Sequence, residues 1–260
     1  MGSQKTQGEL WGKRPQDWAT IQEATGNAGY EHALQFLKIK PGVTLLDVGC
    51  GSGFFSNLAQ VEGADVTGID ASPPLIKQAK RRNAAINFLT GEMEELPFAD
   101  NTFDIVCAFN SIQYAESIKY ALIEAKRVLK EKGKLVLMIW GNKDDCEVAS
   151  YMKAVGSLMP PPPPGAAGPF ALTENQLLEK TLEETGLRII DNIDVTSIWD
   201  YPNADIALKG LISAGTVVKA IDNSSYEKVY ATIAAVIQPY IQQNGSVVYK
   251  NKWRVVICEK

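Results

Sequence analysis

The clearest feature of the chain is an alternation of short apolar runs with longer amphipathic segments between residues 43 and 140. The apolar runs predict five strands, at residues 43–48, 64–70, 86–90, 103–109 and 134–140. The segments between them predict helices at residues 54–60, 74–84 and 116–130, and we expect the last helix to end at Lys132-Gly133. Strands that alternate with helices pair in parallel through crossover connections. We therefore expect an α/β sheet covered by helices on both faces.

After Trp140 the pattern changes. Five consecutive prolines, Pro160 to Pro164, exclude a helix interior and a central strand, because each lacks a backbone donor and has a fixed φ. An extended loop is expected there, which fits a surface spacer, a docking site for a partner or part of a lid. Farther on, the pattern predicts helices at residues 174–185, 203–213 and 225–241 and a strand at 187–195. The chain then closes with a predicted antiparallel hairpin, residues 247–249 and 253–258, which turns at Asn251-Lys252.

These elements divide the chain into four segments. They are an N-terminal helical segment (1–40) with a helix near 29–37, an α/β core (41–142), a Pro-rich loop with a helix (143–186), and the last strands with an inserted helical cap (187–260).

The charge and composition exclude several classes of function. With 26 Lys+Arg and 30 Asp+Glu the net charge is −4, and an acidic chain without a basic stripe argues against a nucleic-acid partner. The short run Lys80-Arg81-Arg82 lies at the end of a predicted helix, where cations are favoured. No apolar run reaches the ~18–20 residues that cross a bilayer, so we expect no membrane insertion. The polar start lacks a signal-peptide core, and the four scattered cysteines and single histidine predict a cytoplasmic protein without a metal site.

The segment Leu45-Leu46-Asp47-Val48-Gly49-Cys50-Gly51-Ser52-Gly53 carries the candidate chemistry. An apolar strand runs into three alternate glycines and then into a helix, and glycine lets a ligand approach the main chain closely. Such a turn at the end of a first strand is the usual ligand crevice of an open α/β sheet. The dinucleotide fingerprint fails because Phe54 or Ser56 stands where its third glycine belongs, and residues 49–60 hold no phosphate-loop lysine. Asp47 favours a ligand that carries positive charge instead.

This segment resembles the first motif of the class I S-adenosylmethionine-dependent methyltransferases. Further motifs of that family follow in order, at residues 66–70 (VTGID), 91–98 (GEMEELPF), 103–106 (FDIV) and 127–135 (RVLKEKGKL). The resemblance covers residues 40–140 strongly and the last strands weakly, and Glu131-Lys132-Gly133 departs from the family's Pro-Gly. It implies a Rossmann-like fold with a seven-stranded, mostly parallel sheet, an antiparallel last strand and a helical cap. Within the family, the chain looks similar to the small-molecule branch of ubiquinone and menaquinone biosynthesis.

The resemblance implies that S-adenosylmethionine is the cofactor and assigns residues to it. The glycines approach its methionyl part, Asp70 holds the ribose hydroxyls, and Glu92 contacts the adenine amino group. A tight turn without a ligand and a solvated acid at the end of a strand are the alternatives for the glycines and Asp70. The implied cofactor-binding residues are Asp47, Gly49, Cys50, Gly51, Asp70, Ala71, Glu92, Met93, Asn110 and Ser111.

The catalytic group stays unassigned. The only imidazole, His32, is suited to act as a base, but a lone helix His is more often a surface or packed residue. Gln113 and Tyr114 are candidates in a loop that is also a plain helix entry. Residues 109–113 lack the [DN]PP[YF] pattern of amino-methylating enzymes. In related enzymes the segment that carries Trp11, Trp18 and Tyr30 folds over the cofactor. There these rings either stack near the sulfonium or pack on the core.

We therefore predict methyl transfer to an oxygen, carbon or nitrogen nucleophile of a small apolar or aromatic acceptor. Residues of the cap form either the acceptor pocket or the cap's own core: Leu158, Met159, Phe170, Trp199, Tyr201, Leu208, Tyr226, Tyr230 and Tyr240. The alternative is a non-catalytic, S-adenosylmethionine-binding regulatory protein of the same fold. A nicotinamide-dependent oxidoreductase is disfavoured by the glycine pattern and a nucleic-acid methyltransferase by the charge. A homodimer stays open.

Overall fold

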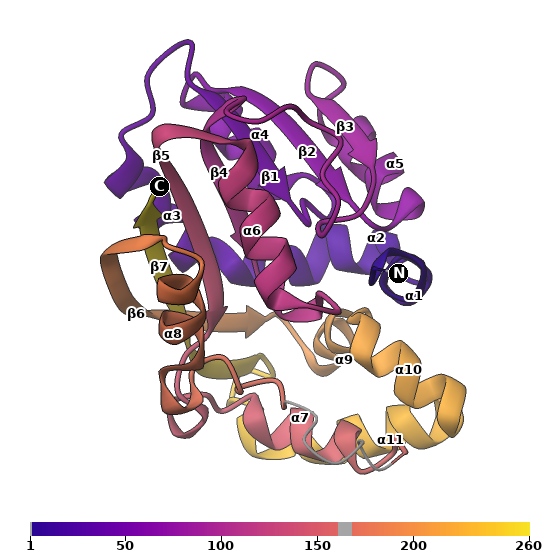
Figure 1. Cartoon of the computed structure of the whole chain (residues 1–260). Coiled ribbons are helices and arrows are strands. Elements are labelled where there is room, and N and C mark those ends of the chain that lie inside the picture. Colours follow the sequence, from indigo (N-terminus) through magenta and orange to yellow (C-terminus); the bar gives the residue numbers. More distant parts are fainter. Residues whose placement is uncertain (1, 161–167) are drawn as a thin grey trace.

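The computed structural model describes residues 2–160 and 168–260, so residues 161–164 of the proline run lie outside the described part. It confirms the α/β prediction. One seven-stranded sheet has the order β3-β2-β1-β4-β5-β7-β6, with helices on both faces (Figure 1). The strands are β1 (Thr44–Val48), β2 (Asp65–Asp70), β3 (Asn87–Thr90), β4 (Phe103–Phe109), β5 (Leu129–Trp140), β6 (Arg188–Tyr201) and β7 (Val247–Glu259).

The helices fall into three groups along the chain. The N-terminal group is α1 (Gln4–Trp11), α2 (Pro15–Asp17) and α3 (Asn27–Leu37), and the core group is α4 (Phe54–Val61), α5 (Pro73–Arg82) and α6 (Ile118–Val128). The later group is α7 (Ala149–Gly156), α8 (Leu177–Glu184), α9 (Ala204–Ile212), α10 (Gly215–Asn223) and α11 (Tyr226–Val236). Figure 1 shows the N-terminal helices between the core sheet and the cap helices α7 and α9 to α11. Every described helix is too short or too polar to cross a membrane.

The centre of the sheet explains where a ligand would bind. β1 pairs in parallel with β2 on one side and with β4 on the other. Four of its five residues are buried, as expected for a strand covered on both faces. The chain order reverses between β1 and β4, and the loops at the carboxyl ends of such strands diverge and leave a crevice. The glycine-rich turn after β1 opens into this crevice.

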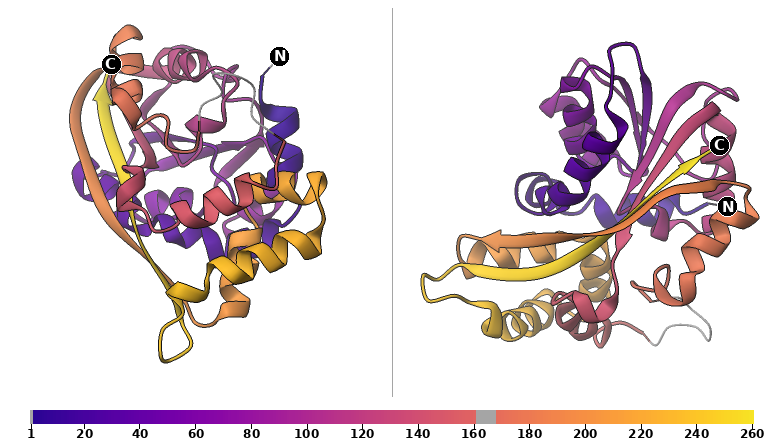
Figure 2. Two further views of the ribbon diagram at one scale, coloured as in Figure 1. Left: turned by 90° about the horizontal axis from the view of Figure 1, so that it is seen from below. Right: turned by 90° about the vertical axis from the view of Figure 1, so that its left-hand side faces the viewer.

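The predicted antiparallel last strand is confirmed, but its predicted hairpin is wrong. Residues 247–259 form one continuous strand, β7, which pairs antiparallel with β5 and with the long strand β6. Asn251 lies opposite Ser197 in this ladder. It is 1% exposed, and its side-chain oxygen accepts a hydrogen bond from Val148 N at 3.0 Å. The buried amide, whose oxygen has a partner, keeps Asn251 within the continuous strand where the sequence suggested a turn. Figure 2 shows β6 and β7 curving together from the core across the cap helices.

Other element boundaries also differ from the predictions. Helix α6 ends at Val128 and β5 starts at Leu129, so Lys132-Gly133 lies inside the strand, where Lys132 takes the left-handed φ of 64°. Strand β6 extends to Tyr201, well beyond the predicted residue 195. Helices α7 and α10 were not predicted; they are only eight and nine residues long, too short for a periodic pattern to stand out.

Candidate functional site

The turn after β1 requires glycine at three positions, because a side chain there would be strained and would collide with its neighbours. Gly49, Gly51 and Gly53 all have positive φ, at 73°, 56° and 76°. A β-carbon on Gly49 would lie 2.3 Å from Ser111 Cβ, and one on Gly51 would lie 2.7 Å from Glu23 Oε1. The backbone N–H groups of Gly49 and Cys50 both donate to Ile69 O, at 2.8 and 3.1 Å. The turn is therefore fixed against β2, and its open face is lined by main chain.

Two carboxylates stand beside the turn. Asp70 accepts hydrogen bonds from Gly51 N at 2.9 Å and from Ser72 N at 2.8 Å, which orient it at the end of β2. Asp47 accepts a hydrogen bond from Ser56 Oγ at 2.6 Å. Burial raises the pKa of Asp47 to about 7 and that of Asp70 to about 6. A ligand that carries a cation or hydroxyl groups would stabilise the ionised form of each carboxylate, in place of the water that burial excludes.

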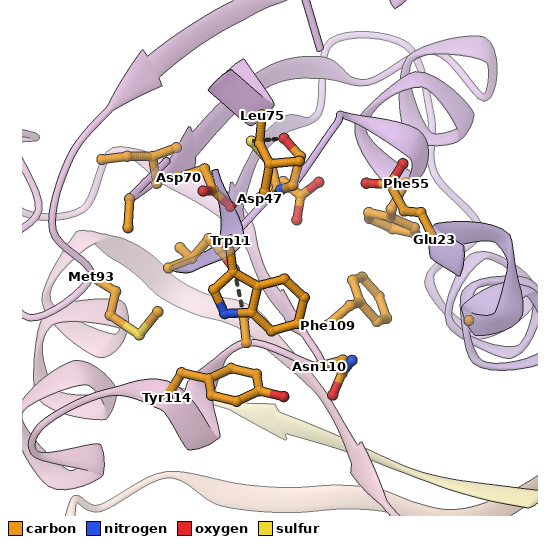
Figure 3. Close-up of a pocket in the computed structure, with 18 of the residues that line it drawn as sticks. Trp11, Glu23, Asp47, Phe55, Asp70, Leu75, Met93, Phe109, Asn110 and Tyr114 are labelled. Carbon is orange, nitrogen blue, oxygen red and sulfur yellow. Dashed lines mark hydrogen bonds between the residues drawn. The ribbon is translucent and has the colours of Figure 1, made fainter. Parts of the chain in front are cut away.

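A first cavity of about 90 Å³ lies over the turn (Figure 3). Its walls include four acids, Glu23, Asp47, Asp70 and Glu92, and the lining residues in the described part of the chain include no Lys, Arg or His. An acidic wall without a cation suits a positively charged ligand and repels a phosphate. Ligand pockets usually measure roughly 300–1,000 Å³, so the segment that covers this cavity has to move outward to admit a nucleoside-sized ligand.

That cover is the N-terminal segment, which is fixed at one end by Glu23. The Glu23 carboxylate is 5% exposed, accepts a hydrogen bond from Ser52 N at 2.7 Å and another from Ser52 Oγ, and pairs with Arg82 at 2.6 Å. Arg82 also donates to Ser52 O and to Ala19 O, each at 2.8 Å. The basic run at the end of α5, explained from the sequence by its helix end alone, thus supplies the cation for a buried acid.

The other end of the cover is held by the loop after β3. The Glu92 carboxylate accepts hydrogen bonds from Gln4 N at 2.7 Å and from Ser3 Oγ at 3.4 Å. Glu94 accepts hydrogen bonds from Ser3 N at 3.2 Å and from Ser117 N at 2.5 Å. Helix α1 therefore starts on two carboxylates, and Glu92, expected at the adenine, also anchors the cover.

The structure brings together the ten predicted cofactor-binding residues, all of which line the first cavity. Trp11, Trp18 and Tyr30 line it too, and Figure 3 shows the Trp11 ring between Asp70 and Tyr114. His32 lines neither this cavity nor the next one. Its Nε2 lies 2.7 Å from Asp191 Oδ2, in an ion pair between α3 and β6. Sequence reasoning missed Glu23 and Arg82, because their partners lie far along the chain and no local pattern marks them.

A second cavity of about 360 Å³ adjoins the first. All five tryptophans of the chain line it, and its lining residues in the described part of the chain include no charged side chain. The two cavities share the residues Trp11, Trp18, Gln22, Thr25, Asn110, Tyr114 and Trp253. Gln113 lines the second cavity only, and its Nε2 donates to Asn110 Oδ1 at 2.5 Å.

The predicted acceptor-pocket residues separate into groups. Met159 and Trp199 line the second cavity. Phe170, Tyr201 and Leu208 are buried in the hydrophobic core, and Leu158 and Tyr240 pack against it. Tyr226 and Tyr230 are 39% and 38% exposed and line neither cavity. Within the described residues, no group of three or more His, Cys, Asp or Glu side chains is close enough to hold a metal ion.

Comparison with known proteins agrees with this geometry. Residues 46–137 match the family model of the methyltransferase domain. A malonyl-[acyl-carrier protein] O-methyltransferase from Erwinia pyrifoliae is 34% identical over 164 residues, which cover 60% of each chain. A demethylmenaquinone methyltransferase from Renibacterium salmoninarum is 41% identical over 97 residues, which are 37% of this chain and 41% of the relative. The chain thus spans 60% or less of the length of these curated relatives.

Solved structures share the fold over a longer part of the chain. A Bacillus halodurans protein proposed to be a methyltransferase superposes with a TM-score of 0.61 at 17% identity, over 89% of this chain and 98% of that protein. At this identity the similarity shows a common fold.

Proposed function

We propose that the whole protein, as a class I S-adenosylmethionine-dependent methyltransferase, transfers a methyl group from S-adenosylmethionine to a small apolar or aromatic acceptor. The observation that carries this proposal is the wall shared by the acidic first cavity and the uncharged second cavity. A donor and an acceptor bound side by side would meet at that wall. The residues that line both cavities are Trp11, Trp18, Gln22, Thr25, Asn110, Tyr114 and Trp253.

The first cavity fits the chemistry of this cofactor. When bound, S-adenosylmethionine supplies a methyl group on a cationic sulfur, and after transfer the electron pair of the broken carbon–sulfur bond stays on sulfur. The turn at Gly49 and Gly51 offers the bare backbone that the methionyl part needs, and Asp47 supplies negative charge for its ammonium group. Asp70 has carboxylate lone pairs for the ribose hydroxyls, and Met93 lines the adenine end.

The chain's own contribution to the reaction is alignment and exclusion of water. Well-oriented reactants can lower a barrier by ~7–11 kcal/mol without any acid or base. Burial raises the pKa of Tyr114 to about 12, so its hydroxyl stays protonated near neutral pH and acts as a hydrogen-bond donor. Tyr114 therefore keeps its own proton and does not act as the base, and Asn110, Gln113 and Tyr114 position the acceptor.

The finer assignments follow from the same site. The aromatic second cavity resembles a site for an uncharged ring such as demethylmenaquinone, which names one relative, more than a site for the malonyl carboxylate that names another. We also propose that the protein works in the cytoplasm, since its four cysteines are free and buried, as a reducing compartment allows.

The test is turnover with methyl-labelled S-adenosylmethionine and a panel of phenols, quinols and aromatic amines, read as S-adenosylhomocysteine release. We expect label to reach at least one aromatic acceptor. Tight binding of the cofactor without transfer to any acceptor would favour the non-catalytic alternative.

A further inference from the structure

We propose that the second cavity is the acceptor site for an uncharged, planar aromatic molecule that carries two oxygen functions. One is a ring hydroxyl near the first cavity, and the other is a carbonyl or ether oxygen beside Trp199, inside the second cavity. The inference rests on the proposed function for the meaning of "acceptor", while the binding site itself follows from this cavity alone.

The walls of the cavity favour a flat ring. Trp140 and Trp253 stack at 4.0 Å between ring centroids, and Trp199 lies 5.6 Å from Trp140. A second aromatic group, on the N-terminal segment, pairs Trp11 with Trp18 at 4.7 Å and with Tyr114 at 5.3 Å. Both groups line the same cavity. A planar aromatic ligand between them would make offset or edge-to-face contacts, the arrangement that aromatic rings prefer.

The lack of charged side chains in the described lining of the cavity excludes ionised ligands. Its lining, within the described residues, holds no Lys, Arg, His, Asp or Glu. A carboxylate or phosphate bound there would lose its hydration and meet no cationic side chain of that lining. The cavity volume of about 360 Å³ lies at the lower end of the usual range for ligand sites, roughly 300–1,000 Å³, and suits a molecule of one or two rings.

Two orphaned polar atoms in the lining specify the oxygen functions. Trp199 is 4% exposed, and among the described residues its Nε1 has no hydrogen-bond partner. The same holds for Gln113 Oε1. Trp18 Nε1 is orphaned too, but it lies beside the glycine turn, 3.3 Å from where a β-carbon on Gly51 would stand, and so faces the first cavity. Buried donors and acceptors are nearly always paired in folded proteins, so unpaired ones in a cavity wall point to a ligand. The Trp199 N–H calls for an oxygen acceptor on the ligand, and Gln113 Oε1 calls for a hydroxyl donor.

The positions of these atoms orient the ligand. Gln113 is bonded to Asn110, which lines both cavities, so the ligand hydroxyl belongs at the shared wall. Trp199 lies on β6 and lines only the second cavity, so its partner oxygen belongs inside the second cavity, away from the shared wall at Asn110.

Isothermal titration calorimetry at pH 7 tests this with three matched probes: 6-acetyl-2-naphthol, 2-naphthol and 6-hydroxy-2-naphthoate. We expect the acetyl compound to bind about tenfold more tightly than 2-naphthol, because its carbonyl pairs with a buried donor, and at least about tenfold more tightly than the carboxylate. Trp199→Phe should weaken the acetyl compound to the level of 2-naphthol and leave 2-naphthol unchanged. Tyr249→Phe is the matched control, since Tyr249 also has an orphaned buried hydroxyl but does not line the cavity. It should change none of the three affinities.

Equal or tighter binding of the carboxylate would overturn the proposal. So would a Trp199→Phe effect that is absent, or equal for the acetyl compound and 2-naphthol. A thermal shift with S-adenosylhomocysteine on the same samples reports separately on the proposed function. If S-adenosylhomocysteine gives no thermal shift while the naphthols bind selectively, only the methyltransferase assignment is overturned. If S-adenosylhomocysteine gives the shift but the naphthols do not bind selectively, only the acceptor class is overturned.

Discussion

The carboxylate of Glu23 accepts a hydrogen bond from the backbone N–H of Ser52 at 2.7 Å, inside the glycine-rich turn. This contact joins the N-terminal cover to the turn that the cofactor must approach. Arg82 completes it with a 2.6 Å ion pair to the same carboxylate. Because Glu23 is 5% exposed, its carboxylate is shielded from water, and this end of the cover is fixed to the turn through one buried acid.

Glu23→Gln should destabilise the protein. The substitution leaves Arg82 without its anion and turns an amide N–H₂ toward a backbone donor. We expect it to lower the free energy of unfolding by about 3 kcal/mol and Tm by roughly 6–12 °C. Thermal unfolding followed by circular dichroism measures this. Glu31→Gln, on the exposed side of the same segment, is the control and should change Tm little. A Tm for Glu23→Gln equal to that of Glu31→Gln would refute the anchoring role.

The turn at Gly49 should not tolerate a methyl group. Gly49→Ala combines a strained φ of 73° with a contact of 2.3 Å to Ser111 Cβ. Gly42→Ala carries the same kind of strain, at φ 88°, but meets no atom within 4 Å. We expect the free energy of unfolding to fall by about 1 kcal/mol for Gly42→Ala and by about 3 kcal/mol or more for Gly49→Ala. Urea unfolding of both variants separates strain from collision, and equal losses would show that the close approach to Ser111 is unimportant.

Cofactor affinity should fall in acid. Burial raises the pKa of Asp70 to about 6, and the ionised form is the one that accepts the ribose hydroxyls. Below that pH each unit should weaken binding of S-adenosylhomocysteine by about tenfold, until the bound form also takes up its proton. Without ligand, the stability of the fold changes with pH in the opposite direction to the affinity. The folded chain keeps the protons of Asp47 and Asp70 that the unfolded chain releases near pH 4, so the free energy of unfolding falls as pH rises toward 7. Calorimetry between pH 5 and 8 checks the affinity, and a flat profile would contradict this role of Asp70.

His32→Gln should leave the site intact. Its ring pairs with Asp191 outside both cavities, and half-buried pairs of this kind contribute about 1 kcal/mol or less. We expect affinity for S-adenosylhomocysteine to change by less than about twofold, as for other sites without shared partners. A larger loss would return His32 to the list of site residues.

The sequence allowed the core and much of the cofactor site to be predicted because both rest on local pattern. Asp47, Gly49 and Asp70 follow two adjacent parallel strands, and the ends of such strands meet at one edge of a sheet. Glu23 and Arg82 could not be found in this way, since they meet only after α5 packs under the N-terminal segment. A single Glu between Gln22 and Ala24 has no signature of its own.

The second cavity was even less accessible to sequence reasoning. Its tryptophans come from five separate segments. Because β7 continues through Asn251 without a turn, Trp253 lies beside Trp140. A hairpin at Asn251-Lys252 would have moved Trp253 elsewhere. Trp199 looked equally suited to the core of the cap, and only the packed structure shows that it lines a cavity with its indole N–H unpaired among the described residues.

The most direct test of the central claim is calorimetric titration of S-adenosylmethionine into the wild-type chain, Asp70→Ala and Asp65→Asn. Asp70 lies in the wall of the first cavity, whereas Asp65 starts the same strand on the exposed surface. We predict one site per chain for the wild type and for Asp65→Asn with equal affinity, and a loss of about 10- to 100-fold for Asp70→Ala. No binding to the wild type, or the same affinity in all three chains, would contradict the account.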